Sequence, residues 1–340
     1  MIHRGFAWAA VVGLLGTGLL SDAYAAGDRT WVSNTSTDKA NWFNDTNWSP
    51  SIVPTSSDHA IIPASLSGSR EMPVIYSSDG SQIAYAQKIT VNASGSDIGT
   101  LDIYGSNSLL ILGDGSARTS TVHGKFRIGQ HGAGTNTTVK IRGDHTIQGA
   151  GGEIVLEKDA LIDEYTNDGD DKLTLKRSGG SACEDYPDGL DCNVLLHGTG
   201  TIKVQLDNRA FVLGDYAIVL DDRAKTGTSE GWWIAENNGS LTITCDVSGA
   251  GHWFLADLGA NGSTLEVGTN GCVSAAGPVL FKEGQFRLSG GDFCTTGDML
   301  WKSVCGDGGC TFKTQPKFFV DNGRTATFGL GGAGTCGSCP

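Results

Sequence analysis

Carboxylate clusters are the first feature of this sequence whose residue types and spacing could do chemistry. Asp168, Asp170 and Asp171 lie close together beside Asn167. Calcium takes several oxygen ligands from such side chains, so this segment is a candidate calcium site. Its spacing matches neither the EF-hand loop nor the nonapeptide repeat of calcium-binding β-rolls, and charge runs are usually solvated. The segment therefore favours an exposed acidic turn, with calcium as the alternative.

A second acidic pair, Asp221-Asp222, is followed closely by the basic residues Arg223 and Lys225. Glycoside hydrolysis needs two carboxyl groups about 5 to 9.5 Å apart, and neighbours on a strand point to opposite faces, so the pair alone does not provide that geometry. A polysaccharide lyase instead needs a basic side chain that removes a proton beside a neutralised uronate. These four residues are the catalytic candidates, and Lys282 is a further candidate base.

Two adjacent indoles, Trp232-Trp233, are candidate contacts for a sugar ring. In a regular strand one of them points outward and the other into the core. Exposed aromatic side chains often mark binding surfaces, so we expect carbohydrate contact through the outward ring and core packing for its neighbour. The histidines, His197 among them, are scattered and show no metal-ligand spacing.

All nine cysteines lie in the second half of the chain, from Cys183 onward. In an exported protein disulfides are the default, so four pairs are expected, with Cys245 left over and buried. A bridge between the tail cysteines of two chains, or a zinc site made by the last four cysteines, is the alternative for the C-terminal end. The expected pairs are Cys183–Cys192, Cys272–Cys294, Cys305–Cys310 and Cys336–Cys339.

Short β-strands must position these residues. Runs such as 88–91, 100–103, 201–204 and 240–243 alternate apolar and polar residues, so each presents one face inward. The chain has 50 glycines and 8 prolines, spread between such runs, and frequent turns between short strands predict an all-β protein.

An internal repeat predicts how the strands stack. The phrase at 238–243 recurs at 261–267, and a related phrase follows at 284–288. About this many residues make one rung of a parallel β-helix, and stacking places each strand about 4.8 Å from a parallel neighbour. We therefore predict a right-handed parallel β-helix over residues 76–300. Domains built as a β-sandwich are the alternative, because sandwich strands also alternate between frequent turns.

Residues 27–75 form a distinct tryptophan-rich segment. An Asn-Trp phrase at Asn41-Trp42 precedes a Val-Pro turn at Val53-Pro54 and then Asp58. This text resembles the opening of bacterial surface β-solenoids and autotransporter passenger regions, and the resemblance implies architecture only. Its tryptophans could form a sugar platform, but the end of a solenoid needs a cover, so we expect a cap. The three tryptophans are Trp31, Trp42 and Trp48.

A second resemblance concerns the carboxylate pair. Asp221-Asp222 is similar to the Asp pair on one strand of β-helix pectinases, the pectate-lyase-like superfamily. That family also carries Gly-His-Gly and Arg-Ile-Lys phrases. This chain has Gly251-His252-Trp253 and Lys140-Ile141-Arg142 instead, and the latter precedes the acidic pair. These departures put a pectinase activity in doubt.

The two ends of the chain are predicted to be non-globular. Residues 1–26 contain a single early arginine, an uncharged apolar run and small residues up to Ala26, which is the pattern of a secretory signal peptide. Residues 301–340 are rich in cysteine and glycine. We therefore expect a secreted or cell-surface protein with no membrane insertion after signal cleavage.

The formal charge of −13 makes nucleic acid an improbable partner. Two functions stay open. The first is a structural, adhesive or display solenoid, standing alone or assembling with copies of itself. The second is a carbohydrate-active β-helix protein, either a polysaccharide lyase or a glycan-binding module, that contacts extracellular polysaccharide. No cofactor is expected, with calcium as a possible exception. A groove lined by acidic, basic and aromatic residues would favour carbohydrate, whereas a smooth Thr/Asn/Ser face would favour structure.

Overall fold

The computed structural model describes residues 26–33, 38–68, 70–77, 82–129, 136–177, 193–221, 229–255, 262–277, 279–281, 284–296, 299–301, 305–306, 309–310, 317–320 and 326–328. Their elements are strands joined by turns, with one short 3-10 helix, η1 (Asp45–Asn47). No helix within these ranges is long and apolar enough to cross a membrane. The predicted signal peptide lies almost entirely outside the described residues. The predicted all-β class is confirmed.

Most of the strands pair in four parallel ladders. The first ladder contains β4 (Val74–Tyr76), β9 (Thr100–Tyr104), β12 (Lys125–Ile128), β15 (Glu153–Glu164), β17 (Leu195–Ile202), β19 (Phe211–Leu220), β20 (Trp232–Ala235), β23 (His252–Leu255), β26 (Val279–Phe281) and β29 (Met299–Trp301). The second ladder contains β5 (Ile83–Ala86), β10 (Leu109–Leu112), β13 (Thr137–Ile141), the later parts of β15, β17 and β19, and then β21 (Ser240–Ile243), β24 (Thr264–Gly268), β27 (Gln285–Ser289) and β32 (Lys317–Val320). These two ladders share one 17-stranded sheet, because β15, β17 and β19 each belong to both.

The third and fourth ladders form two further sheets. The third contains β1 (Asp28–Trp31), β3 (His59–Ile62), β6 (Lys88–Val91), β11 (Arg118–Val122), β14 (Asp144–Gly149), β16 (Lys172–Arg177) and β18 (Gln205–Arg209). The fourth contains β22 (Asp246–Gly249), β25 (Cys272–Ala275), β28 (Asp292–Thr295) and β33 (Ala326–Phe328). The antiparallel pairs are β1 with β2 (Trp48–Ser49), β7 (Ala93–Ser94) with β8 (Asp97–Ile98), and β30 (Cys305–Gly306) with β31 (Gly309–Cys310).

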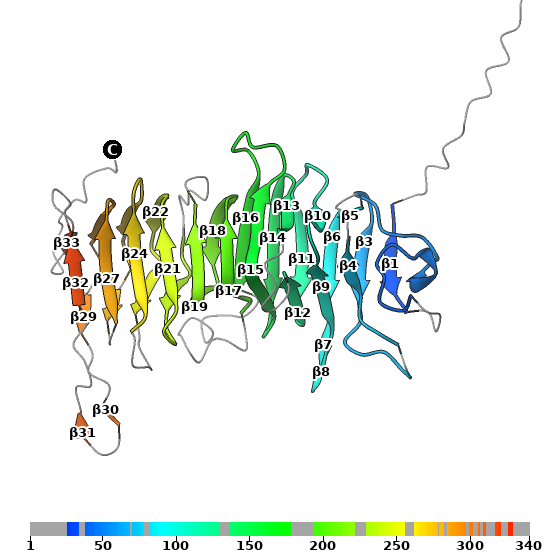
Figure 1. The fold of residues 1–340 in the computed structure, drawn as a ribbon, viewed down its shortest axis with the longest axis horizontal. Coiled ribbons are helices and arrows are strands. Elements are labelled where there is room, and N and C mark those ends of the chain that lie inside the picture. The colour runs from blue at the N-terminus through cyan, green and yellow to red at the C-terminus, as the bar shows by residue number, and fades with distance from the viewer. Residues whose placement is uncertain are drawn as a thin grey trace, which may run out of the picture.

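The chain visits the ladders in a fixed order, from the first to the second and then to the third or fourth. Each visit places a new strand beside the strand of the previous visit, so the strands succeed one another along the long axis from β1 to β33 (Figure 1). Parallel pairing throughout the ladders differs from the antiparallel sheets of a β-sandwich, the alternative fold. The ladders also continue past residue 300, because β32 and β33 pair with β27 and β28.

The internal repeat corresponds to stacked strands, as predicted. Leu241 of β21 lies opposite Leu265 of β24, which lies opposite Phe286 of β27. All three side chains are almost completely buried. Equivalent positions of the repeated phrase therefore stack in one row inside the molecule.

A row of inward side chains runs along the first ladder and forms the core. Its members are register partners on successive strands, and each is at most 1% exposed. Burying each such side chain contributes about 1.5 to 3 kcal/mol, and no rung has enough apolar surface to do this alone. The row consists of Leu101, Phe126, Ile154, Leu196, Val212 and Trp233.

The tryptophan-rich segment covers the N-terminal end of the stack, where β1 lies (Figure 1). Trp31, Trp42 and Trp48 are at most 1% exposed. The ring of Trp48 packs edge-on against Trp42 at 4.6 Å and against Trp31 at 5.0 Å between centroids. Buried indoles cannot stack on a sugar from solvent, so their position agrees with a cap and not with a sugar platform.

Candidate functional site

The corner between the first and second ladders is hollowed at β17. Between Leu156 and Ala160, β15 inserts three residues opposite the single Thr199 of β17. On the other side, β19 inserts Gly214, Asp215 and Tyr216 opposite a single residue of β17. Both neighbours therefore bulge outward while β17 takes the shortest path, which leaves a depression above it.

Gly198 makes this short path possible. Its φ is +108°, in a region that side chains disfavour, and a Cβ there would lie 1.9 Å from the carbonyl oxygen of Leu156. No residue with a side chain fits at this place without displacing β15. The depression therefore follows from a glycine at the point of closest approach between β15 and β17.

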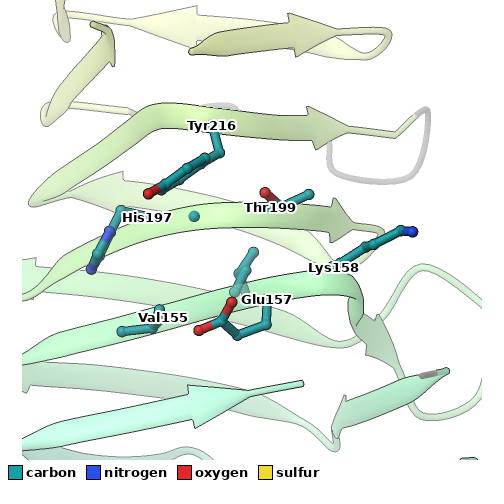
Figure 2. A pocket seen from close by; sticks show the side chains of 8 residues that line it. Val155, Glu157, Lys158, His197, Thr199 and Tyr216 are labelled. Carbon is teal, nitrogen blue, oxygen red and sulfur yellow. The ribbon is translucent and has the colours of Figure 1, made fainter. Parts of the chain in front are cut away.

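The depression is a cavity of about 320 Å³. Figure 2 shows it between β15, which carries Glu157 and Lys158, and β19, which carries Tyr216. Its polar groups are a carboxylate, an ammonium, an imidazole, a hydroxyl and a phenol. The lining residues are Val155, Leu156, Glu157, Lys158, His197, Gly198, Thr199 and Tyr216.

His197 is fixed at one side of this cavity by two carboxylates. Its Nδ1 lies 3.0 Å from Oδ2 of Asp215, and its Nε2 lies 3.7 Å from Oε2 of Glu153. The backbone N–H of Gly198 donates to Oδ1 of Asp215, so that carboxylate is held as well. Burial alone would lower the pKa of His197, but the hydrogen bond to Asp215 and the charge of Glu153 outweigh burial and raise the pKa to about 9. The imidazole is therefore positively charged at neutral pH.

Glu153 joins His197 to the neighbouring strand. Lys125 of β12 lies directly opposite Glu153 of β15, and its Nζ is 2.8 Å from Oε2 of Glu153. The charges of His197 and Lys125 outweigh burial and lower the pKa of Glu153 to about 2. Asp215, His197, Glu153 and Lys125 therefore form a continuous chain of alternating charge across four strands.

A second ion pair lies beside this chain on the same outer side. Nη1 of Arg127 is 3.5 Å from Oδ2 of Asp102, its register partner on β9. Burial raises the pKa of Asp102 against the opposing charges of Arg127 and Lys125. Glu157 adds to the rise, which places its carboxylate within electrostatic reach of Asp102. The basic side chains of this surface are therefore compensated by acidic ones.

These groups are suited to binding more than to proton transfer. A catalytic base needs a free lone pair near its working pH, and an imidazolium with a pKa of about 9 has none. Tyr216 is 65% exposed, and its ring forms one wall of the cavity. An exposed ring beside fixed polar groups can pack on the apolar face of a sugar while hydroxyl groups hydrogen-bond to the wall.

The predicted division of Trp232-Trp233 into one outward and one inward ring is confirmed, while the sugar contact stays a prediction. Trp233 is fully buried in the core, and its Nε1 donates to Oγ of Ser229 at 2.9 Å, so its ring cannot reach a ligand. Trp232 points to the outer side but packs against Phe211 at 6.5 Å between ring centroids. Neither indole lines the cavity. The alternation of apolar and polar residues correctly predicted that the two indoles point to opposite faces. It could not predict that the outward indole packs against other apolar side chains.

Of the predicted catalytic residues, Asp221 is the one that lies within the described residues, and it does not contact the cavity. Asp221 directly follows β19, and its Oδ2 lies 3.4 Å from Nζ of Lys203. The remaining candidates, Asp222, Arg223, Lys225 and Lys282, lie outside the described residues.

The predicted calcium ligands belong to a hydrogen-bonded turn. Asp171 accepts the backbone N–H groups of Gly143 and Tyr165, and Asp168 accepts that of Asp170. The backbone thus already uses carboxylate oxygens that calcium would need. No group of three or more His, Cys, Asp or Glu side chains is placed to hold a metal ion within the described part of the chain.

The predicted disulfides are placed only in part. Cys272 on β25 and Cys294 on β28 lie on neighbouring strands, with registers two residues apart, because Cys272 faces Asp292 and Cys294 faces Ser274. Cys305 and Cys310 are register partners in the β30–β31 hairpin, and Cys245 is buried. Cys272 and Cys294 are each disulfide-bonded, and the pairing within every predicted bridge stays a prediction. The remaining four cysteines, Cys183, Cys192, Cys336 and Cys339, lie outside the described residues.

The residues that build this site were not singled out from the sequence. Glu153, His197, Asp215 and Tyr216 come from three strands, and nothing local connects them. One signal was available: Gly214-Asp215-Tyr216 interrupts the apolar alternation of a long strand, as outward bulges do. Comparison of the chain with protein-family models, curated proteins and solved structures finds no match. The function is therefore argued from the site alone.

Proposed function

We propose that this chain is an exported right-handed parallel β-helix that binds extracellular polysaccharide on the outer side of its first ladder. The fixed order in which the strands enter the parallel ladders supports the helical path. The signal-like residues 1–26 and the cysteine-rich second half support export and disulfide bonds. An adhesive role follows from a stiff column that carries a binding site on its side.

One observation carries the proposal. The cavity at β17 is lined by a carboxylate, a basic side chain and an exposed tyrosine, from Glu157, Lys158 and Tyr216 in the bulges at the corner between the ladders. A purely structural solenoid has no need of this combination or of the glycine that opens the cavity. Concave sites with a few convergent polar groups are where small ligands bind.

The charged side chains at the cavity favour a protein that binds polysaccharide over one that cleaves it. A lyase needs a neutral base and a cation that is free to neutralise a uronate. His197 is protonated and already shared between Asp215 and Glu153. Lys158 is the remaining basic residue among the described residues that line the cavity.

The test is retention of the purified protein on a panel of soluble and insoluble polysaccharides, by affinity electrophoresis and by pull-down. We expect retention on at least one polymer and its loss in Tyr216→Ala. The matched control is Tyr76→Ala, which removes another exposed tyrosine of the first ladder, away from the cavity, and should leave retention unchanged. Failure of the wild type to bind any polymer contradicts the proposal. A rise in absorbance from unsaturated uronate products would replace it with a lyase.

A further inference from the structure

Tyr216 stands between two cavities. Besides the cavity at β17, Tyr216 also lines a second cavity of about 570 Å³. The second cavity is lined by Asp215, Tyr216, Asn237 and Asn238. Tyr216 lines both cavities and is the most exposed of the large hydrophobic side chains in the described chain. The two hollows are therefore joined over one aromatic ring.

The two cavities follow each other along the stacking direction. The first lies over β15 and β17, Tyr216 belongs to β19, and the asparagines form the turn between β20 and β21. Strands in such a ladder are about 4.8 Å apart, which is close to the rise of one sugar in an extended pyranose chain. A linear glycan lying parallel to the stack would therefore meet one cavity, the ring and the other cavity in turn.

The second cavity is built for hydroxyl groups. Asn237 and Asn238 are exposed and have left-handed backbones, with φ of 58° and 65°, which project both amides from a tight turn. An amide carries both donors and acceptors, although Nδ2 of Asn237 already donates to Oε1 of Glu236 at 3.3 Å. Asp215 contributes a carboxylate that is anchored to His197. No basic residue is among the described residues that line this cavity.

The charges around both cavities argue against an acidic ligand. Lys125, Arg127 and His197 each lie within ion-pair distance of a carboxylate on the same surface. Lys158 is the one basic residue lining either cavity for which no ion pair is found among the described residues, and Glu157 precedes it. The whole chain carries a formal charge of −13. A polyuronate would bring further negative charge to a surface on which Lys158 is the single lining cation without an ion pair among the described residues.

We infer that the ligand is a linear, uncharged polysaccharide that lies along the stack, with sugars in both cavities and the ring of Tyr216 packed between them. This inference rests on the proposed function and narrows it to one substrate class. It also excludes polyuronates, which a lyase of this architecture would need as substrate.

The test is isothermal titration of the full protein with cello-oligosaccharides and xylo-oligosaccharides of graded length, and with oligogalacturonates of matched length. We expect affinity for at least one neutral series to rise with length until both cavities are occupied, and oligogalacturonates to bind at least about tenfold more weakly. Tyr216→Ala should weaken binding of short and long neutral ligands by about tenfold, the order of effect for one buried aromatic contact.

Asn237→Gly tests the contribution of the second cavity to binding separately from that of the first. Glycine keeps the left-handed backbone while removing the amide. It should weaken binding of long neutral ligands and leave short ones unchanged. Equal or tighter binding of oligogalacturonates with loss in Tyr216→Ala overturns the inference and leaves the proposed function standing. Absence of binding to any polysaccharide in the panel overturns both. Binding of neutral glycans that Tyr216→Ala does not weaken overturns the placement of the ligand.

Discussion

The outer side of the first ladder has two halves that differ in chemistry although they share one backbone. In β12 and β15 the outward residues include Lys125, Arg127 and Glu153, which pair with other charged side chains. In β19 and β20 the same register positions hold Phe211 and Trp232, with further apolar residues around them. Phe211, Leu213 and Ile234 form a second buried cluster, separate from the main core.

This difference teaches that the inward row fixes the fold while the outward rows are free to vary. Inward positions are apolar in both halves, because stacking buries them whatever lies outside. Outward positions can therefore change from ion pairs to packed aromatics over a few strands. The cavity at β17 lies where the two halves meet, between a charged strand and an apolar one. Function in such a fold depends on the outer rows.

The largest expected effect comes from the apolar half. Phe211→Ala removes a side chain that is 1% exposed and should lower the free energy of unfolding by about 3 to 5 kcal/mol. Lys125→Ala, in the same outward row of the charged half, breaks a partly exposed ion pair and should cost no more than about 1 kcal/mol. Urea unfolding of both variants measures the difference. Equal costs would show that the two halves are not energetically distinct.

Adding one methyl group at Gly198, at the boundary between the two halves, should lower the stability of the fold. Gly198→Ala places a Cβ at positive φ and against the carbonyl of Leu156, so we expect a loss of about 2 to 3 kcal/mol. Gly68→Ala is the control, because that glycine also has positive φ but no atom within 4 Å of the added Cβ. A Gly198→Ala cost no greater than that of Gly68→Ala would mean that β17 and β15 are not in close contact.

The charged half should show its own pH dependence. The pKa of His197 is about 9 in the folded chain against 6.5 for an ordinary histidine, so its contribution is complete below pH 6.5 and is lost as the pH rises toward 9. We expect a loss on the order of 2 kcal/mol over this range, seen as a falling midpoint of urea unfolding. His197→Gln should flatten this alkaline limb.

Buried His145 should change the stability with pH in the opposite direction to His197, so it serves as the internal reference. Burial lowers its pKa to about 4, so its contribution is complete above pH 6.5 and is lost as the pH falls toward 4. The acid limb should therefore persist in His197→Gln. Loss of both limbs in that variant would assign the alkaline limb to a general effect and not to the charged half.

The smallest effect on stability is expected at the cavity itself. Tyr216→Ala removes a side chain that is 65% exposed, so the free energy of unfolding should change by less than about 0.5 kcal/mol. Thermal unfolding checks this. A larger loss would mean that Tyr216 supports the corner of the fold, and its effect on glycan binding would then need the Asn237→Gly variant for interpretation.

Much of the fold could be predicted from the sequence, and little of the candidate site. The alternating runs, the glycine turns and the phrase repeated at 238–243 and 261–267 predicted stacked strands, and their pairing follows that repeat. Alternation also predicted one inward and one outward indole at Trp232-Trp233. It could not predict that the outward one packs on Phe211.

The sequence by itself determined which side chains face inward, because the alternation of apolar and polar residues can be recognised within a few neighbouring residues. Only the tertiary structure decided which outward side chains meet. Lys125, Glu153, His197 and Asp215 come from four strands, and their contacts depend on the register of each strand on the next. That register changes at the corner, where β15 and β19 bulge and β17 does not. A local run such as Gly214-Asp215-Tyr216 can signal that a strand bulges, but the residues of the neighbouring strand that face the bulge depend on the register between the strands.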